Sequence, residues 1–334
     1  MFRTLLTYIV NLIFLILIFV GSEAYHLYTK PSTISQTKLF IVDKGATLTQ
    51  ISNKLAKEHL ISVPALFKYS TLLLCKSYGI RAGEYEIPAH SSINQIFKIL
   101  SSGKFYEHNI VIPEGFTVYQ IKERLNNEQA LCGDISNITI KEGSLMPTSL
   151  KYLRGTDRAI ILQRLMEAQK KRVEKIWQNR DKSIPLKNSE ELVNLASIIE
   201  KEVSSPKERY LAASVFYNRL IKHIKLQSDP TVVYGVYGSK GKAKSIPIYK
   251  SDLENDNAYN TYKIFGLPKT AIANPGYDAL YATAHPANTK FLYFVSAGNG
   301  THIFSERLEK HIEAVKNMRH RQQQQKNNLI MQGG

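Results

Sequence analysis

Two glutamates lie close together in the segment LASIIEKEVSSPKERYLAASVFYNRL, residues 195–220: Glu200 ends an apolar run, and Glu202 follows two residues later. A helix here has one narrow apolar stripe, formed by Leu192, Ala196, Ile199 and Val203. Glu200 and Glu202 fall on opposite borders of that stripe. An apolar wall raises the pKa of a neighbouring carboxyl group, so Glu200 in a cleft could stay protonated near neutral pH and act as a general acid.

The same spacing also permits a purely structural role. Most glutamates at the border of a core keep their carboxyl group in water, and both of these residues fit that description. The pattern of the helix alone therefore leaves the two interpretations open.

The residues around the glutamates predict two helices that meet at a corner. Asn188 can cap the first helix, with the Glu191 side chain reaching back toward the cap. Ser205 as a cap, Pro206 at the first helical position and Glu208 at the third predict the start of the second helix. The turn between the two helices is short, so their ends must lie close together.

Two further segments share a strand–turn–helix pattern, FIVDKGATLTQISNKLAKE from Phe40 and NIVIPEGFTVYQIKERLNNE from Asn109. Thr47 and Thr117 follow a glycine turn and are predicted to cap the helices. Residues 83–103 are predicted to have the same strand–turn–helix pattern. The first copy resembles a LysM module, a small fold associated with binding N-acetylglucosamine-containing glycans. The alternative is that these units only pack together as a spacer.

The amino terminus predicts membrane attachment. Residues 5–21 contain no charged side chain, and through Ala24 the stretch reaches the ~20 residues that a helix needs to cross hydrocarbon. A cleaved signal peptide is the alternative, although its apolar region usually runs only ~7–15 residues. Arg3 and the terminal amine favour a cytoplasmic amino end, which places the rest of the chain outside the cytoplasm.

Length and composition limit the number of folded units and the kinds of partner. The 334 residues are 43% hydrophobic and carry a net charge of +16. The length suits two or three folded units, and the charge favours anionic partners such as nucleic acid, a lipid surface or an acidic polymer. Cys75 and Cys132 are expected to be buried thiols, with a disulfide as the alternative. No array of cysteine and histidine has the spacing of a zinc site.

Six motifs, the first two of them within the helical corner, occur in this order: ASIIEKE (196–202), SVFYNRL (214–220), LQSDPTVVYG (226–235), AYNTYKIFGLP (258–268), IANPG (272–276) and AHPAN (284–288). With the apolar amino terminus and the LysM-like segment, this series resembles the endolytic murein transglycosylases of the MltG (YceG-like) family over nearly the whole chain.

The resemblance implies a peptidoglycan lytic transglycosylase. Such an enzyme cleaves the β-1,4 bond between N-acetylmuramic acid (MurNAc) and N-acetylglucosamine (GlcNAc) within glycan strands, and leaves 1,6-anhydroMurNAc ends. The family's catalytic residue is the first glutamate of E-K-E, which is Glu200 here. Because the sugar's own 6-hydroxyl replaces water as nucleophile, one carboxyl group can serve as acid and then as base. No metal or organic cofactor is needed.

Polar and aromatic side chains in the same motifs suit a sugar, which offers hydroxyl groups to bond and C–H faces to stack on. The weaker candidates for substrate binding are Asn218, Gln227, Asp229, Thr231, Tyr234, Asn260, Tyr262 and His285. Each also has a structural interpretation as a turn or packing residue.

The sequence departs from the family pattern at several positions. The family tends to show E-G-x-x-x-P-D-T-Y ahead of the catalytic helix. Here Glu142, Gly143 and Pro147 are kept, but residues 148–150 read Thr-Ser-Leu, so the acid and the aromatic ring are missing. Val203 and Lys269 also differ from the usual Thr and Pro. The missing acid and aromatic ring leave one wall of the predicted sugar groove, expected beside residues 195–235, in doubt.

The sequence therefore predicts an α+β protein with an N-terminal transmembrane helix, a LysM-like strand–helix region and a mixed α/β catalytic domain. The predicted parts are an anchor (1–24), a linker (25–37), the LysM-like region (38–108), a second strand–helix unit (109–140), the catalytic domain (141–318) and a disordered tail (319–334).

The predicted location is the inner (cytoplasmic) membrane, single-pass, with the catalytic domain on the extracytoplasmic side. The predicted partners are glycan strands, membrane lipid through residues 5–24, and peptidoglycan synthases beside which it would work; nucleic acid is not among them.

Three other functions compete with this prediction. A membrane-anchored wall-binding protein would carry an inert Glu200. A helix-turn-helix nucleic-acid binder would use the corner and the positive charge, but its second helix carries Val-Phe-Tyr where exposed basic side chains are expected. A pyridoxal-phosphate lyase would need a Schiff-base lysine and a phosphate loop, and the sequence singles out neither.

Overall fold

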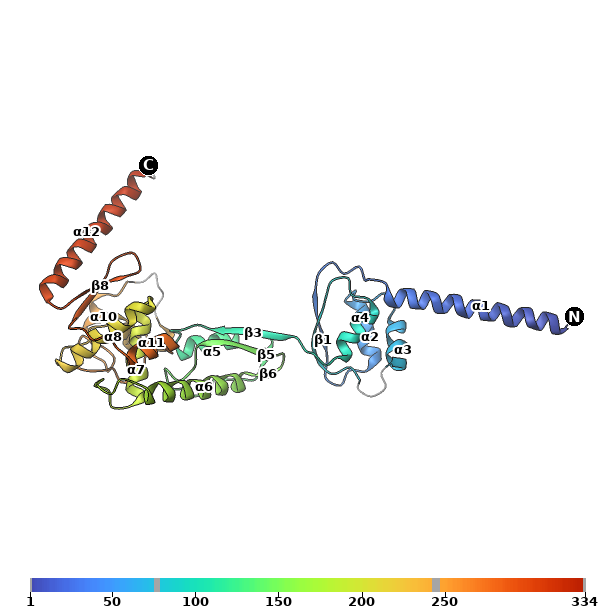
Figure 1. Ribbon diagram of the computed structural model, residues 1–334, viewed down its shortest axis with the longest axis horizontal. Coiled ribbons are helices and arrows are strands. Elements are labelled where there is room, and N and C mark those ends of the chain that lie inside the picture. The colour runs from blue at the N-terminus through green and yellow to red at the C-terminus, as the bar shows by residue number, and fades with distance from the viewer. Residues whose placement is uncertain (1, 75–78, 242–246, 333–334) are drawn as a thin grey trace. The chain divides into compact units, whose positions relative to one another are not determined.

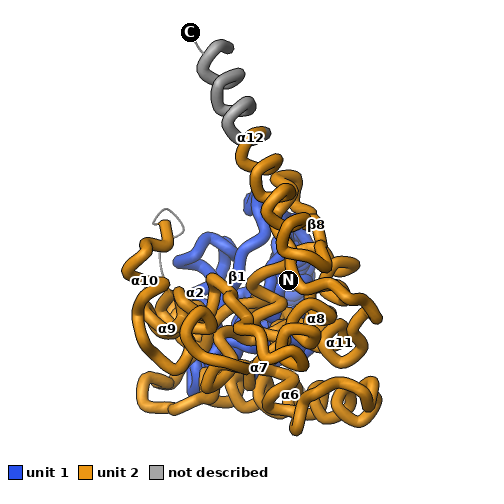
Figure 2. Tube along the Cα trace, turned by 90° about the vertical axis from the view of Figure 1, so that its left-hand side faces the viewer, with its two compact units in different colours: residues 1–109, 151–155 blue, residues 110–150, 156–334 orange. Residues whose placement is uncertain are grey.

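A computed structural model describes residues 2–74, 79–241 and 247–332 of the chain, with side chains described through residue 320 (Figure 1). The chain forms two compact units (Figure 2). The first comprises residues 1–109 and 151–155, and the second comprises residues 110–150 and 156–334. Helices and strands occur in both units, which confirms the predicted α+β class.

The first unit begins with helix α1 (Phe2–Thr29), which is long and apolar enough to cross a membrane and has no buried residue. The helix continues five residues past the predicted end of the anchor at Ala24, into the stretch that we expected to be a linker. Tyr28, near its end, packs against the core of the unit.

The body of the first unit follows the order strand, helix, helix, strand, helix. Its elements are β1 (Lys38–Val42), α2 (Leu48–Lys57), α3 (Pro64–Leu74), β2 (Gly83–Ile87) and α4 (Ile93–Ser101). Strands β1 and β2 are antiparallel, with Phe40 opposite Tyr85. Both rings are fully buried, together with Leu55 and Phe67, and form the core of the unit.

Capping explains where three of the helices begin. Thr47, Ser92 and Thr117 each accept a hydrogen bond from a backbone N–H three residues later, and the glutamine at that later position bonds back to the cap. Each pair forms a capping box, which satisfies two otherwise unpaired donors. The predicted caps at Thr47 and Thr117 are therefore confirmed.

Strands β3 (Glu107–Ile112) and β5 (Thr148–Leu153) pair with each other, and the division between the two units falls within both. The second unit then contains α5 (Val118–Asn126), the short parallel pair β4 (Leu131–Cys132) and β6 (Thr156–Asp157), and the long helix α6 (Arg158–Gln178). Thr148 and Ser149, which stand where the family has an acid and a threonine, begin β5.

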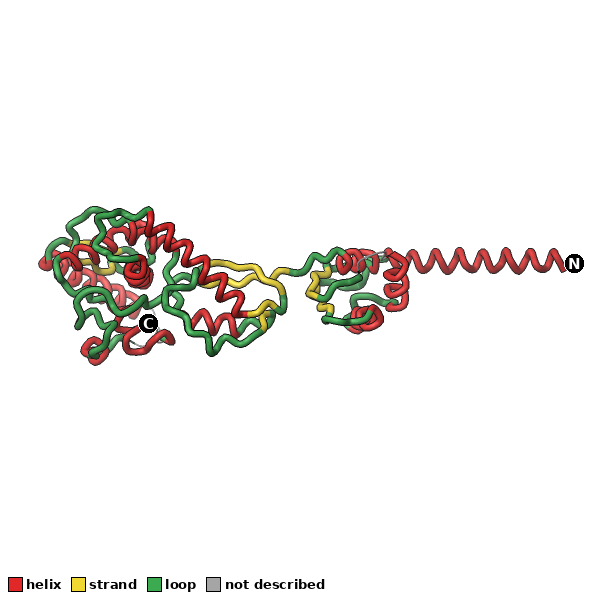
Figure 3. Tube along the Cα trace, turned by 90° about the horizontal axis from the view of Figure 1, so that it is seen from below, coloured by secondary structure: helices red, strands yellow, loops and turns green. Residues whose placement is uncertain are grey.

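Helices α7 (Ser189–Glu202) and α8 (Pro206–Ile221) form the predicted corner in the second unit. Helix α11 (Tyr277–Ala284) packs against α6, α7 and α8. The rest of the unit consists of α9 (Asp229–Tyr237), the 3₁₀ turn η1 (Gly238–Lys240), α10 (Lys250–Glu254), the hairpin β7 (Tyr293–Ser296) and β8 (His302–Ser305), and α12 (Leu308–Gln332). Helices and loops make up most of this unit, and its strands are short (Figure 3).

The apolar stripe predicted on the first corner helix is confirmed. Its four residues have no exposed surface, and Leu192, Ala196 and Ile199 pack in a core cluster with Phe216 of α8 and Leu280 of α11. Burial on this scale, at about 25 cal/mol per Å² of apolar surface, holds α7 between its neighbours.

Four local expectations differ from the structure. Ser205 begins α8 without a side-chain cap bond: the Glu208 N–H bonds to the Ser205 carbonyl oxygen, and the Glu208 carboxylate accepts hydrogen bonds from the backbone and ring of His302. The Glu191 carboxylate accepts a hydrogen bond from the Lys187 N–H, one residue before the cap. Cys132 is exposed rather than buried; Cys75 lies outside the described residues, so a disulfide between them stays untested. Helix α12 extends to Gln332, where we expected a disordered tail.

Candidate active site

The site around Glu200 is built by the end of α7, the start of α8 and the turn before α11. The Glu200 side chain is only 5% exposed. Its Oε1 atom accepts a hydrogen bond from Nη2 of Arg209 at 2.8 Å, and its Oε2 atom accepts one from the backbone N–H of Gly276 at 2.9 Å. Helix geometry thus brings Glu200 from one helix and Arg209 from the next into a buried ion pair.

The turn of the corner fixes the arginine. Arg209 Nε donates to the carbonyl oxygen of Val203 at 3.1 Å, and the Arg209 side chain is 7% exposed. Val203 is the residue that departs from the family's usual threonine. Its contact to Arg209 uses the backbone, so a change of side chain at this position leaves the contact in place.

Opposing effects act on the Glu200 carboxyl group. Burial raises its pKa above the usual value and is the largest effect, while the Gly276 N–H and the Arg209 charge act in the lowering direction. The nearby carboxylates of Glu114 and Asp278 add to the upward shift. The net direction is upward, as the sequence predicted, but the ion pair limits how far the pKa rises.

Glu114 brings a second carboxylate to this site. It lies in the turn between β3 and α5 and is exposed. Its carboxylate covers the Cα atom of Gly276 so closely that a side chain at that glycine would collide with it. The adjacent Gly115, with a φ of 72° in the left-handed region, packs against the Glu200 side chain. An exposed carboxylate therefore lies beside Gly276, whose N–H binds Glu200.

Glu202 occupies a different environment on the opposite side of α7. Its Oε1 atom accepts a hydrogen bond from the Ser228 hydroxyl at 2.5 Å. The pKa of Glu202 is raised to about 7, with burial as the largest cause; the Ser228 hydrogen bond acts in the lowering direction, Asp229 in the raising direction and Arg219 in the lowering direction. Two neighbouring glutamates thus have two separate carboxyl environments.

The raised pKa of Glu202 predicts a pH dependence of stability. The folded pKa of about 7 exceeds the ordinary value of 4.5, so the folded state binds the extra proton and the free energy of unfolding falls as pH rises between these two values. The shift corresponds to about 3 kcal/mol. We expect Glu202→Gln to lack this fall when urea unfolding is compared with wild type from pH 4.5 to 8. Parallel curves for the two proteins would contradict the assignment.

A third carboxyl group ties the segments around the site together. Glu142 accepts hydrogen bonds from the Val118 N–H at 2.5 Å, from the Tyr234 hydroxyl at 3.0 Å and from the Asn274 side chain at 3.3 Å. Asn274 also binds the backbone of Phe116, at the turn that carries Glu114. This network fixes the position of the IANPG segment and hence of the Gly276 N–H.

The weaker sequence candidates do not gather at Glu200. Within the described residues, none of the eight forms a hydrogen bond with its carboxylate. Tyr262 donates to Asp229 at 2.7 Å beside Glu202, and Tyr234 bonds to Glu142.

The other five candidates bond elsewhere. Asn218 binds backbone carbonyls before β7, the Gln227 N–H bonds to Thr261, and the Thr231 hydroxyl is buried against Thr261. The Asn260 side chain donates to a backbone carbonyl oxygen of its own loop, and His285 bonds to the carbonyl oxygen of Asn179. Their role in substrate binding stays a prediction.

Sequence reasoning missed the three groups that contact or surround Glu200. Arg209 follows the second-helix start signal by only a few residues and resembles an ordinary surface arginine. Gly276 acts through its backbone, to which no side-chain pattern points. Glu114 lies in the repeat that we had interpreted only as strand–turn–helix. Arg209 lies on the next helix, Glu114 is far from Glu200 in sequence, and Gly276 acts through its main chain, so the periodicity of one helix could not find them.

The fold and the site together define a class: an α+β protein with one helix long and apolar enough to span a membrane and a buried glutamate suited to acid–base chemistry. The model of the YceG-like family matches residues 40–317. The chain belongs to the YceG-like family.

Relatives and a solved structure agree with this membership. An endolytic murein transglycosylase of Bacillus subtilis (strain 168) is 31% identical over 306 residues, which is 82% of each chain. One of Streptococcus pneumoniae (strain D39) is 25% identical over 338 residues, 85% of this chain and 60% of that relative. A YceG-like protein from Listeria monocytogenes has 28% identity and a TM-score of 0.51, with coverage of 83% of this chain and 99% of that one.

Proposed function

We propose that the protein is an endolytic peptidoglycan lytic transglycosylase that cleaves the MurNAc–GlcNAc β-1,4 bond within glycan strands and leaves 1,6-anhydroMurNAc ends. The observation that carries the proposal is the buried Glu200 carboxyl group, with its raised pKa, at the helical corner of a YceG-like chain. The names of the relatives support the substrate.

Glu200 acts first as an acid in this mechanism. It donates its proton to the glycosidic oxygen as the bond from that oxygen to C1 of MurNAc breaks and oxocarbenium character builds. The carboxylate that forms is stabilised by Arg209 at 2.8 Å and the Gly276 N–H at 2.9 Å, both already in place. These donors thus favour the state that follows proton transfer, whereas burial favours the state that precedes it.

Glu200 then acts as a base. It takes the proton from the 6-hydroxyl of the same sugar as that oxygen forms a bond to C1, which closes the anhydro ring and restores the protonated glutamate. No water takes part in the reaction. One carboxyl group donates a proton and then takes one back, and one C1–O bond forms for the one that breaks. The exposed Glu114 carboxylate lies at the solvent side of the site, where developing positive charge on the sugar would be stabilised.

We further propose that α1 is a single-pass anchor in the cytoplasmic membrane, with the remainder on the extracytoplasmic side where peptidoglycan lies. Arg3 before the apolar stretch supports this orientation. Peptidoglycan synthases are proposed as the enzymes beside which it works, and the LysM-like region as a glycan-binding unit.

The nucleic-acid alternative has less support. Arg209 and Arg219 of α8 are buried, and both are held by protein hydrogen bonds. A recognition helix needs such side chains free to reach base edges. A corner with buried arginines fits a scaffold for Glu200 better than a DNA-reading surface.

End-group analysis tests the proposed reaction. Purified peptidoglycan is digested with the detergent-solubilised full chain, and the fragments are analysed by mass spectrometry. We expect 1,6-anhydroMurNAc ends. Reducing ends would instead show hydrolysis, and an absence of new fragments would favour the wall-binding alternative.

A further inference from the structure

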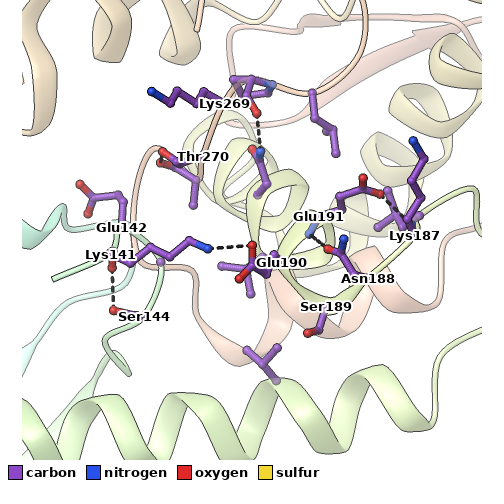
Figure 4. A pocket seen from close by; sticks show the side chains of 18 of the residues that line it. Lys141, Glu142, Ser144, Lys187, Asn188, Ser189, Glu190, Glu191, Lys269 and Thr270 are labelled. Atoms are coloured by element: carbon purple, nitrogen blue, oxygen red, sulfur yellow. Dashed lines mark hydrogen bonds and ion pairs between the residues drawn. The ribbon is translucent and has the colours of Figure 1, made fainter. Parts of the chain in front are cut away.

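A cavity of about 890 Å³ lies at the start of α7, and its charges balance, because four lysines and four glutamates line it (Figure 4). Lys141 pairs with Glu190 at 2.7 Å, and Glu191 accepts a hydrogen bond from the Lys187 N–H. Such a lining selects no ligand by its charge. The first unit, in contrast, has an apolar surface that is open to water.

Helix α3 carries this apolar surface. Four large side chains in its second half are more than half exposed, at 61% for Tyr69, 60% for Leu72, 79% for Leu73 and 54% for Leu74. Tyr69, Leu72 and Leu73 are three and four residues apart, so they share one face of the helix. The buried Phe67 lies on the opposite face. Contiguous exposed apolar residues mark interaction surfaces.

The composition of α3 favours a lipid surface. Lys68 is the one charged side chain between Pro64 and Leu74, and its ammonium nitrogen lies 5.7 Å from the centre of the Tyr69 ring. Leucines, an aromatic residue and a lysine without any acid are typical of helices that lie in the plane of a membrane interface. A tyrosine ring suits the headgroup level, and a lysine stem follows the apolar surface while its charge meets the headgroups.

Helix α3 lies beside the end of α1. The two helices are in contact, and α3 occupies the side of the first unit from which α1 emerges (Figure 1). Within the described part of α1, only Ala24 and Tyr28 are partly buried, so its last two turns make the contacts with the unit. These turns follow Glu23, which is the first charged side chain after the apolar stretch.

The dimensions of a bilayer place α3 at the level of the headgroups. Helix α1 rises about 9 Å from Glu23 to Thr29. A bilayer has about 30 Å of hydrocarbon and about 40–45 Å with its polar layers, so each polar layer is about 5–8 Å deep. With the uncharged residues 4–22 in hydrocarbon, the last turns of α1 cross the polar layer, and α3 lies beside them.

We propose that the exposed face of α3, formed by Tyr69, Leu72 and Leu73, docks on the lipid surface into which α1 inserts. The leucines enter the boundary between headgroups and acyl chains, and Lys68 meets the lipid phosphates. The first unit is then held against the membrane by two helices, and its LysM-like region meets glycan strands close to the membrane. The proposal rests on the proposed membrane anchor and goes beyond it.

Fluorescence quenching at two depths tests the proposal. The chain has a single tryptophan, Trp177 in α6, so Leu73→Trp adds one reporter on α3 to a known background. The full-length protein is placed in vesicles of phosphatidylcholine and phosphatidylglycerol whose acyl chains carry bromine either near the carbonyl end or near the methyl end. An interfacial helix lies about 5–10 Å into the boundary, so we expect the added fluorescence to be lost mainly to the shallow bromines.

Phe14→Trp and Leu39→Trp are the matched controls. Phe14 lies in the middle of the apolar stretch, so a tryptophan there should be quenched mainly by the deep bromines. Leu39 is an exposed leucine of β1, on the side of the first unit away from α1 (Figure 1), and its variant should show the wild-type background. Quenching of Phe14→Trp without quenching of Leu73→Trp would overturn the docking and leave the anchor intact. Quenching of neither would overturn both.

One further variant and the protein density separate a lipid surface from a second copy of the chain. Quenching of Leu72→Asp/Leu73→Trp should fall toward the Leu39→Trp background, because a carboxylate opposes entry into the boundary and is repelled by phosphatidylglycerol. Undiminished quenching in this variant would contradict docking through this face. An emission shift that grows with the protein-to-lipid ratio and ignores the bromines would assign the face to a second copy and overturn the proposal. Adding Glu200→Gln to Leu73→Trp should leave its quenching unchanged, so the result does not depend on the proposed reaction.

Discussion

Glu200→Gln is expected to lower kcat for glycan cleavage by about 10²–10⁴-fold, the usual contribution of general acid–base assistance. Glutamine keeps an oxygen that can accept from Arg209 or from the Gly276 N–H, but it carries no transferable proton. The decisive measurement is the rate of appearance of anhydro ends on purified glycan strands at a fixed pH. Circular dichroism of the same sample shows whether the fold is retained.

Glu202→Gln is the matched control for that experiment. It lies two residues away on the same helix and its pKa is raised to about 7, yet its carboxyl group bonds to Ser228 on the other side of α7. We expect its kcat to stay within about threefold of wild type, well short of the loss at an acid–base residue. If Glu202→Gln were the inactive variant and Glu200→Gln the active one, the roles assigned to the two carboxyl groups would be reversed.

The comparison of these two glutamates shows what helical periodicity can decide. It placed Glu200 and Glu202 on opposite borders of the stripe, and the structure gives them separate environments there. Periodicity could not say which border meets the turn before α11 and the turn after β3, because that depends on chain segments more than 70 residues away. The Gly276 N–H and Glu114 belong to such segments.

The same limit explains the other results of the sequence analysis. The caps at Thr47 and Thr117 were predicted correctly because a capping box uses only four consecutive residues. Ser205 has the same signature, but His302 from a distant hairpin takes the Glu208 carboxylate that the box would need. Tertiary contacts therefore override local signals where a charged group finds a better partner.

Order along the chain was also a weak guide to the site. Asp229 and Tyr262 come from motifs that the resemblance joins to Glu200, yet they bond to each other beside Glu202. Asn274 and Gly276 come from a single five-residue motif and act through different groups, a side chain and a backbone N–H. A motif indicates that a segment belongs to the site, whereas the contact of each residue depends on how the segments pack.

Loss of the Arg209 charge should have the second large effect. Removal of one partner from a buried ion pair typically costs about 3–5 kcal/mol, because it leaves the other charge without compensation. Arg209 and Glu200 are 7% and 5% exposed, so Arg209→Met leaves a buried carboxylate. We expect a fall of that size in the free energy of unfolding at pH 8, measured by urea denaturation, and a smaller fall at pH 5.

The sign of the pH effect follows from the ion pair. Arg209 lowers the pKa of Glu200, so its loss raises the folded pKa still further above the unfolded one. Stability is then retained below the unfolded pKa and lost as pH rises through the higher folded pKa. For the same reason, the alkaline limb of the rate profile, on which the acid loses its proton, should move to higher pH.

The double variant Glu200→Gln/Arg209→Met should recover part of the free energy of unfolding, and that free energy should no longer differ between pH 5 and pH 8. A destabilisation that is equal at both pH values, and that persists in the double variant, would mean that Arg209 acts by packing alone.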